Sequence, residues 1–201
     1  MLNKMQEVNT VQKRRKLMSR VYAFLADGFE EVEAIAVIDV LRRAGAEVVT
    51  VSVMGRYEVR GSHSIDVRAD ALYEKCRVAD GDLIFLPGGG LGTENLYNCR
   101  ALKKDLHTYL EQGKRVAAIC AAPSILGRYG LLEGKKATCY PGFEETLAGA
   151  QYTRQGVVTD GLITTARGMG FAVDLGLELA GLLFGKEKEK DIKESIQHPD
   201  C

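Results

Sequence analysis

The sequence has no excess of charge of either sign and no long apolar run. Lys and Arg together number 27, and so do Asp and Glu, which gives a formal net charge of zero. A general nucleic-acid binder would carry a basic excess, so we expect no nucleic-acid partner. No apolar run approaches the roughly 18 residues that a membrane-spanning helix needs, so we expect no membrane association.

Cysteine and histidine occur without the spacing of a metal or disulfide site. The five cysteines include no C-x-x-C pair, and the three histidines lie far apart in the chain. A zinc ribbon or a disulfide framework would show paired spacing. We therefore predict no metal, no cofactor and a reducing, cytoplasmic location.

The length of 201 residues fits one compact domain. Residues 1–20 carry six basic residues and one acid, with no apolar segment typical of a secretory signal, so we expect a flexible basic extension. The domain is predicted over 21–185. Residues 186–201 form a charged tail that either adds a surface helix or frays.

Apolar strand-like runs alternate with segments of helical periodicity. Strands are predicted at 21–26, 46–53, 83–87 and 115–119, and less regular ones near 137–139, 157–159 and 162–165. Helices are predicted at 29–43, 99–112, 122–129 and 170–184, and residues 57–67 suggest a peripheral hairpin. This order predicts an α/β fold with a mostly parallel sheet and helices on both faces.

Ligands of such sheets bind beyond the carboxyl ends of the strands. Three of these ends carry suggestive residues: Asp27–Glu33, Pro87–Gly92 and Ile119–Pro123. In the last, Cys120 joins a strand to a helix start, where free N–H groups and the helix dipole stabilise a thiolate and lower its pKa. A buried structural cysteine explains the spacing equally well.

The other two strand ends offer a backbone oxyanion site and a carboxylate. Gly88 to Gly92 bring backbone N–H groups close to a substrate, or simply form a turn. Glu30, Glu31 and Glu33 open the next helix, where acids favour the helix dipole. One of them, near a thiol, could instead donate or accept protons, and helical periodicity does not indicate which.

Four segments in this order resemble the ThiJ/PfpI superfamily, in the branch of the DJ-one proteins and their bacterial relatives. They are ADGFEEVEAIAVIDVLRRAG (26–45), LPGGGLG (86–92), AAICAAPSIL (117–126) and TTARGMG (164–170). The resemblance runs from about Val21 to Gly185. It implies a flavodoxin-like three-layer sandwich and a homodimer.

The resemblance also implies roles for individual residues. Cys120 matches the reactive nucleophile, and Glu33 matches the glutamate that hydrogen-bonds to it. Gly89 and Ala121 match the residues whose backbone N–H groups form the oxyanion site, and Gly88 is a further pocket residue.

Three positions depart from the relatives. Ala121 stands where protease-like relatives have the histidine that follows the cysteine, which argues against a protease. Tyr140 stands where another branch has a histidine, and tyrosine is a poor base at neutral pH. His63 stands where relatives often have arginine, and we predict that it lies at the pocket edge.

Three functions share these features. The first is a cofactor-free enzyme on a small reactive carbonyl or glycated substrate, of glyoxalase or deglycase type, through a hemithioacetal on Cys120. The second is a redox sensor or stress chaperone whose cysteine is oxidised to sulfinate rather than turned over. The third is a binding or regulatory protein with a vestigial site.

The helix at 29–43 predicts a dimer interface. Its apolar residues point in more than one direction, so not all of them can face one sheet, and an exposed apolar patch is usually an interface. These residues are Ile35, Val37, Ile38, Val40 and Leu41. Asp39 and Arg43 are candidate interface residues by the resemblance.

Overall fold

A computed structural model describes residues 19–200, and the basic segment predicted at the N-terminus lies almost entirely outside them. The centre of the described fold is a seven-stranded sheet in the order β10-β11-β7-β6-β1-β2-β5. Only β10 runs antiparallel to its neighbour; the other pairs are parallel. The strands are β1 (Arg20–Leu25), β2 (Glu47–Ser52), β5 (Ala71–Leu72), β6 (Leu83–Leu86), β7 (Arg115–Ile119), β10 (Val157–Asp160) and β11 (Ile163–Ala166).

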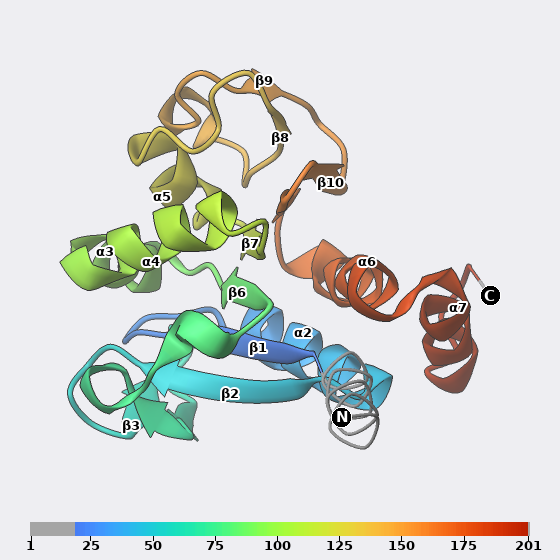
Figure 1. The fold of residues 1–201 in the computed structure, drawn as a ribbon, viewed down its shortest axis with the longest axis horizontal. Coiled ribbons are helices and arrows are strands. Elements are labelled where there is room, and N and C mark those ends of the chain that lie inside the picture. Colours follow the sequence, from blue (N-terminus) through green and yellow to red (C-terminus); the bar gives the residue numbers. More distant parts are fainter. Residues whose placement is uncertain (1–18, 201) are drawn as a thin grey trace, which may run out of the picture.

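Helices cover both faces of the sheet (Figure 1). One face carries α2 (Glu31–Ala44) and α6 (Ala172–Phe184), and the other carries α3 (Gly90–Asn98), α4 (Arg100–Glu111) and α5 (Pro123–Arg128). Each face has its own apolar core. This is the flavodoxin-like three-layer sandwich that the sequence predicts.

The central strands are apolar throughout because both of their faces are buried. In β1, Val21, Ala23 and Leu25 pack into the core beneath α2 and α6. The alternating residues Tyr22 and Phe24 pack into the opposite core. A strand enclosed in this way needs apolar side chains at every position, which explains the unbroken run in the sequence.

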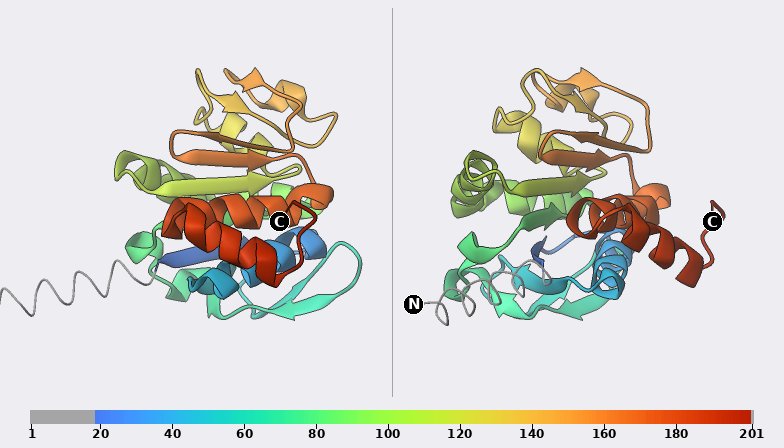
Figure 2. Two further views of the ribbon diagram at one scale, coloured as in Figure 1. Left: turned by 90° about the vertical axis from the view of Figure 1, so that its right-hand side faces the viewer. Right: turned by 45° about the vertical axis from the view of Figure 1, so that its right-hand side comes forward.

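Smaller elements decorate the sandwich. The hairpin of β3 (Glu58–Arg60) and β4 (Asp66–Arg68) confirms the predicted peripheral hairpin. A separate two-stranded sheet of β8 (Lys136–Ala137) and β9 (Gln151–Tyr152) lies at the far end from β2 (Figure 2). The described residues also form short 3-10 helices at η1 (Tyr73–Lys75), η2 (Val78–Asp80), η3 (Glu144–Thr146) and η4 (Met169–Phe171).

Two segments differ from the sequence prediction. Helix α3 was not predicted, because three consecutive glycines at its start resemble a loop. The strand predicted near 137–139 forms β8, outside the main sheet. The charged tail does form a helix, α7 (Lys186–Ser195), which packs outside α6 (Figure 2) and buries Ile192.

The apolar residues of α2 are mostly covered within the chain. Helix α6 packs along the side of α2 that the sheet leaves free, and Gly176 provides the close approach to Val40. Of the five residues expected to need a partner, only Ile35 is exposed. That part of the dimer argument is wrong, since it assumed one covering layer instead of two. No helix within residues 19–200 has the length and apolar character to span a membrane.

Candidate active site

Three loops meet at the carboxyl edge of the sheet and bring Cys120, Glu33 and Gly88 together. Gly88 follows β6, and its N–H donates to Oε2 of Glu33 at 3.0 Å. A methyl group on Gly88 would lie 2.4 Å from that oxygen and 2.6 Å from Cβ of Cys120. Only glycine fits here, and its small size lets the carboxyl group and the thiol sit side by side.

Cys120 stands on the sharp turn that the sequence predicts. Its φ of 63° is left-handed, a conformation that costs a residue with a side chain roughly 1–2 kcal/mol. Backbone hydrogen bonds hold the turn on both sides: Cys120 N–H donates to Ala166 O at 2.9 Å, and Tyr140 N–H donates to Cys120 O at 2.8 Å. The turn directs the sulfur away from the strand, toward Glu33.

Two backbone N–H groups face the sulfur of Cys120. They belong to Gly89 and Ala121, the pair predicted to form the oxyanion site, and both lower the pKa of the thiol. Gly89 has a φ of 91°, and a Cβ there would lie 2.2 Å from Gly28 O. Glycine is therefore required for the loop to present this N–H group.

Glu33 is a buried carboxyl group with a raised pKa. Its side chain sits in the first turn of α2 with only 1% of the residue exposed. Burial raises its pKa to about 7, and the charge of Glu30 adds to the shift. Hydrogen bonds with the Cys120 thiol and the N–H groups of Gly88 and Met169 act in the opposite direction. The group titrates near neutral pH.

The predicted low pKa of the Cys120 thiol is wrong in this geometry. Burial raises it to about 12, and the charge and hydrogen bond of ionised Glu33 add to the effect. These outweigh the N–H groups of Gly89 and Ala121. At neutral pH the thiol therefore keeps its proton while Glu33 is partly ionised, and the sulfur becomes a nucleophile when its proton moves to the Glu33 carboxylate.

His63 lies over the start of α2, where it binds Glu31 rather than Cys120. Both its backbone N–H, at 2.6 Å, and its Nδ1, at 3.0 Å, contact the Glu31 carboxylate. The Ser62 hydroxyl donates to the same group at 3.0 Å. Burial alone would raise the pKa of Glu31, but these hydrogen bonds lower it to about 2. The same contact raises the pKa of His63.

The fold places one possible set of metal ligands within residues 19–200. Donor atoms of Glu30, Glu31 and His63 all lie within 4.8 Å of one another. The Glu31 oxygens already accept the hydrogen bonds from His63 and Ser62, and Glu30 Oε2 caps α2 by accepting from Glu33 N–H at 2.6 Å. The arrangement is complete as a hydrogen-bonded ion pair. The expectation of no metal stays a prediction.

Tyr140 lies at the rim of the site. Its backbone contacts Cys120, while its ring is half exposed and lies against Gly168, where a Cβ would be 3.3 Å from Cδ2. Within the described part of the chain, its hydroxyl makes no hydrogen bond to protein. It contributes a surface next to the site rather than a base directed at the sulfur.

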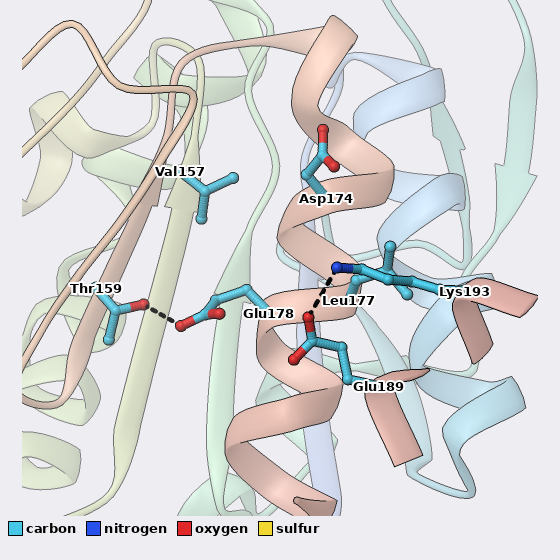
Figure 3. A pocket seen from close by; sticks show the side chains of 7 residues that line it. All are labelled: Val157, Thr159, Asp174, Leu177, Glu178, Glu189 and Lys193. Carbon is cyan, nitrogen blue, oxygen red and sulfur yellow. Dashed lines mark hydrogen bonds and ion pairs between the residues drawn. The ribbon is translucent and has the colours of Figure 1, made fainter. Parts of the chain in front are cut away.

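A cavity of about 280 Å³ lies elsewhere, between β10, α6 and α7 (Figure 3). Its acids have partners. Glu189 contacts Lys193 at 3.2 Å, Glu178 accepts from the Thr159 hydroxyl at 3.0 Å, and Asp174 contacts His198 at 3.2 Å. The Asp174–His198 contact joins the segment after α7 to α6, and each acid that lines the cavity has a partner.

The model of the family described as DJ-1/PfpI family matches residues 19–181. The chain belongs to the DJ-1/PfpI family. Protein DJ-1 homolog B of Arabidopsis thaliana is 44% identical over 170 residues, which cover 84% of this chain and 39% of that protein. The chain thus spans less than half the length of this plant relative.

Two further members extend the DJ-1/PfpI comparison. A Pyrococcus abyssi protein named a deglycase is 34% identical over 150 residues, 74% of this chain and 89% of the relative. The structure of oxidized Toxoplasma gondii DJ-1 has a TM-score of 0.84 and 38% identity, covering 89% of this chain and 98% of that one. The fold is therefore that of the family over nearly the whole described chain.

Proposed function

We propose that this protein is a cofactor-free enzyme that converts reactive carbonyls, of the methylglyoxal class, through a covalent adduct on Cys120. The observation that carries the proposal is the pairing of a thiol with a buried carboxyl group whose pKa is about 7. A base with such a pKa both accepts and returns protons efficiently at neutral pH. The related Pyrococcus protein carries the name deglycase, which supports the same substrate class.

The first step forms a bond between the Cys120 sulfur and the aldehyde carbon. The thiol proton passes to the Glu33 carboxylate, and the carbonyl electrons move onto oxygen. The N–H groups of Gly89 and Ala121, which face the sulfur, are placed to stabilise that oxyanion. Glu33 then gives its proton to the oxygen, which yields a neutral hemithioacetal and restores the carboxylate.

The second step is an internal redox exchange between neighbouring carbons. Glu33 removes the proton from the sulfur-bearing carbon and returns one to the adjacent carbon through an enediol. The first carbon is oxidised to a thioester and the second is reduced to an alcohol. Water then hydrolyses the lactoyl thioester, which releases lactate and regenerates the thiol. A glycated amine would enter as its carbonyl adduct and leave as the free amine.

Mass spectrometry during turnover tests the proposal. Incubation with methylglyoxal should place a hemithioacetal or lactoyl mass on the Cys120 peptide while lactate accumulates. Full turnover by Cys120→Ser would overturn the mechanism. This chemistry needs reduced cysteine, so we propose a reducing, cytoplasmic setting; Cys76, Cys99, Cys120 and Cys139 are free thiols in the structure.

Redox sensing is the second candidate, favoured by the related Toxoplasma structure, which is named as oxidized. Here peroxide would convert Cys120 to a sulfinate that hydrogen-bonds to protonated Glu33. Because Glu33 can accept the thiol proton, peptide mapping after mild peroxide should show sulfinate on Cys120. Stable sulfinate without any carbonyl turnover would select this function over the enzyme.

We also propose a homodimer built on α2. Val32 and Ile35 are 50% and 45% exposed on this helix, and Val173 on neighbouring α6 is also exposed. Such apolar surface is typical of an interface. Asp39 and Arg43 form an exposed ion pair at 2.6 Å further along α2 and would lie at its edge. Sedimentation at micromolar concentration should give a dimer mass, and a monomer mass would refute the proposal.

A further inference from the structure

The loop that joins β11 to α6, residues 167–171, contacts both reacting groups of the site. Directly before it, Ala166 O accepts the N–H of Cys120 at 2.9 Å. At its centre, in η4, the N–H of Met169 hydrogen-bonds to the Glu33 carboxyl group. A shift of this loop would therefore change the positions of the sulfur and the carboxyl group together.

The ring of Tyr140 covers this loop from one side. It lies against Gly168, where a Cβ would be 3.3 Å from Cδ2 of Tyr140. Gly168 is buried, although the tyrosine itself is half exposed. The N–H of Tyr140 donates to Cys120 O at 2.8 Å. The same residue thus contacts the loop through its ring and the Cys120 turn through its backbone.

The ring of Phe171 holds the loop from another side. The Phe171 N–H donates to Gly168 O at 2.8 Å, which closes the turn of η4. Its ring lies on Gly156, where a Cβ would be 2.2 Å from Cε1, and Gly156 O accepts the N–H of Arg167 at 2.8 Å. Because only a glycine leaves room for this ring, the segment before β10 fixes where the loop lies.

The turn at Cys120 needs such support because its backbone is strained. A φ of 63° in a residue with a side chain persists only where the surrounding structure enforces it. We propose that Tyr140 and Phe171 are positioning residues, whose rings together hold the 167–171 loop and thereby keep the sulfur of Cys120 facing Glu33. The inference rests on the proposed carbonyl chemistry and adds two residues to it. Neither ring takes part in bond making or proton transfer.

Kinetics with methylglyoxal test whether the two rings act through one loop. Tyr140→Ala and Phe171→Ala should each lower kcat about tenfold, with little change in KM, because misplaced reacting groups slow the chemical step. Tyr140→Phe and Phe171→Tyr keep a ring and should stay within about threefold of the intact protein. The double alanine variant should lose little more than either single one, since both rings support the same loop.

The matched control is Tyr57→Ala. Tyr57 is also only partly buried, but its ring contacts Arg68, whose guanidinium carbon lies 4.7 Å from the ring centre. Its loss should leave kcat unchanged. Losses that multiply in the double alanine variant, or a loss in Tyr140→Phe as large as in Tyr140→Ala, would overturn the shared role of the rings.

Amide hydrogen exchange tests the support of the Cys120 turn without any turnover. In Tyr140→Ala and Phe171→Ala the N–H of Cys120 should exchange about tenfold faster than in the intact protein, because the turn opens locally. The N–H of Val116, which donates to Leu162 O at 3.0 Å at the other end of β7, should exchange as before and shows that the fold is intact. Unchanged exchange at Cys120 in both variants overturns the inference. Absence of methylglyoxal turnover by the intact protein overturns the proposed reaction instead, whatever the exchange result.

Discussion

Glu31 and Glu33 stand two positions apart in the first turn of α2, and both are buried, yet they titrate in opposite directions. The pKa of Glu31 falls to about 2, whereas that of Glu33 rises to about 7. Glu31 accepts from the backbone and ring of His63 and from the Ser62 hydroxyl. Glu33 receives backbone N–H groups from Gly88 and Met169, faces a thiol and lies near the charge of Glu30.

The contrast shows that the set of donors, more than burial, separates an anchor from a titrating group. Hydrogen bonds to an ionised carboxylate favour its charged form, while burial disfavours it. At Glu31 the hydrogen bonds outweigh burial, so the carboxylate stays ionised and holds the β3–β4 hairpin onto α2. At Glu33 burial outweighs the hydrogen bonds, so the group can exchange protons with Cys120 at neutral pH. Four predictions test this division.

The largest expected effect is that of Cys120→Ser on carbonyl turnover. A serine hydroxyl is a far weaker nucleophile than the thiol, so lactate formation from methylglyoxal should fall to background. Cys76→Ser is the matched control, because Cys76 is partly buried in a different core, and it should retain full activity. Measured turnover by Cys120→Ser equal to that of the control would remove sulfur from the mechanism.

The next effect separates the two glutamates directly. Glu33→Gln should lower kcat/KM by roughly 100-fold or more, the usual scale for one acid–base group. In the intact protein kcat/KM should rise with pH through about 7 as Glu33 ionises, and this rising limb should be absent in Glu33→Gln. Glu31→Gln should keep the rising limb. Its kcat/KM should fall by less than about tenfold, because the β3–β4 hairpin is held less firmly. A limb that moves with Glu31 would reverse the assignment.

Stability should depend on pH with opposite sign at the two positions. The folded pKa of Glu33 lies above its ordinary value of 4.5, so its contribution is present below pH 4.5 and is lost as pH rises through about 7. The free energy of unfolding of Glu33→Gln, relative to that of the intact protein, should therefore rise by up to about 3 kcal/mol between pH 4 and pH 8.

The Glu31 carboxylate should behave in reverse. Its folded pKa is lowered to about 2, so its contribution is present above its ordinary value of 4.5 and is lost as pH falls toward 2. Glu31→Gln should thus be most destabilising at neutral pH. Urea unfolding of both variants across this range checks the signs, and parallel curves for the two would contradict the comparison.

Much of this site could be predicted from the sequence, and the contrast between the glutamates could not. Unbroken apolar strands and the turn at Cys120 follow from local residue types, so the sheet and the edge that gathers Gly88, Cys120 and the α2 acids were predictable. Periodicity along α2 cannot say which acid meets a thiol and which meets a hairpin, because both partners come from distant loops. The prediction of a low pKa for the Cys120 thiol was wrong for the same reason, because the burial of the thiol and the ionised Glu33 beside it are properties of the assembled site.

Tyr140→Phe should have the smallest effect, a change in kcat/KM below about threefold. The ring is half exposed against Gly168, and its hydroxyl has no protein hydrogen bond within residues 19–200. Phenylalanine keeps the ring and removes only the hydroxyl, so a steady-state assay isolates that group. The result bears on the comparison because Glu33 would then be the sole proton carrier beside Cys120. A loss as large as that of Glu33→Gln would instead show that Tyr140 has taken the role of the histidine found in relatives, and that the proton path from the thiol has two members.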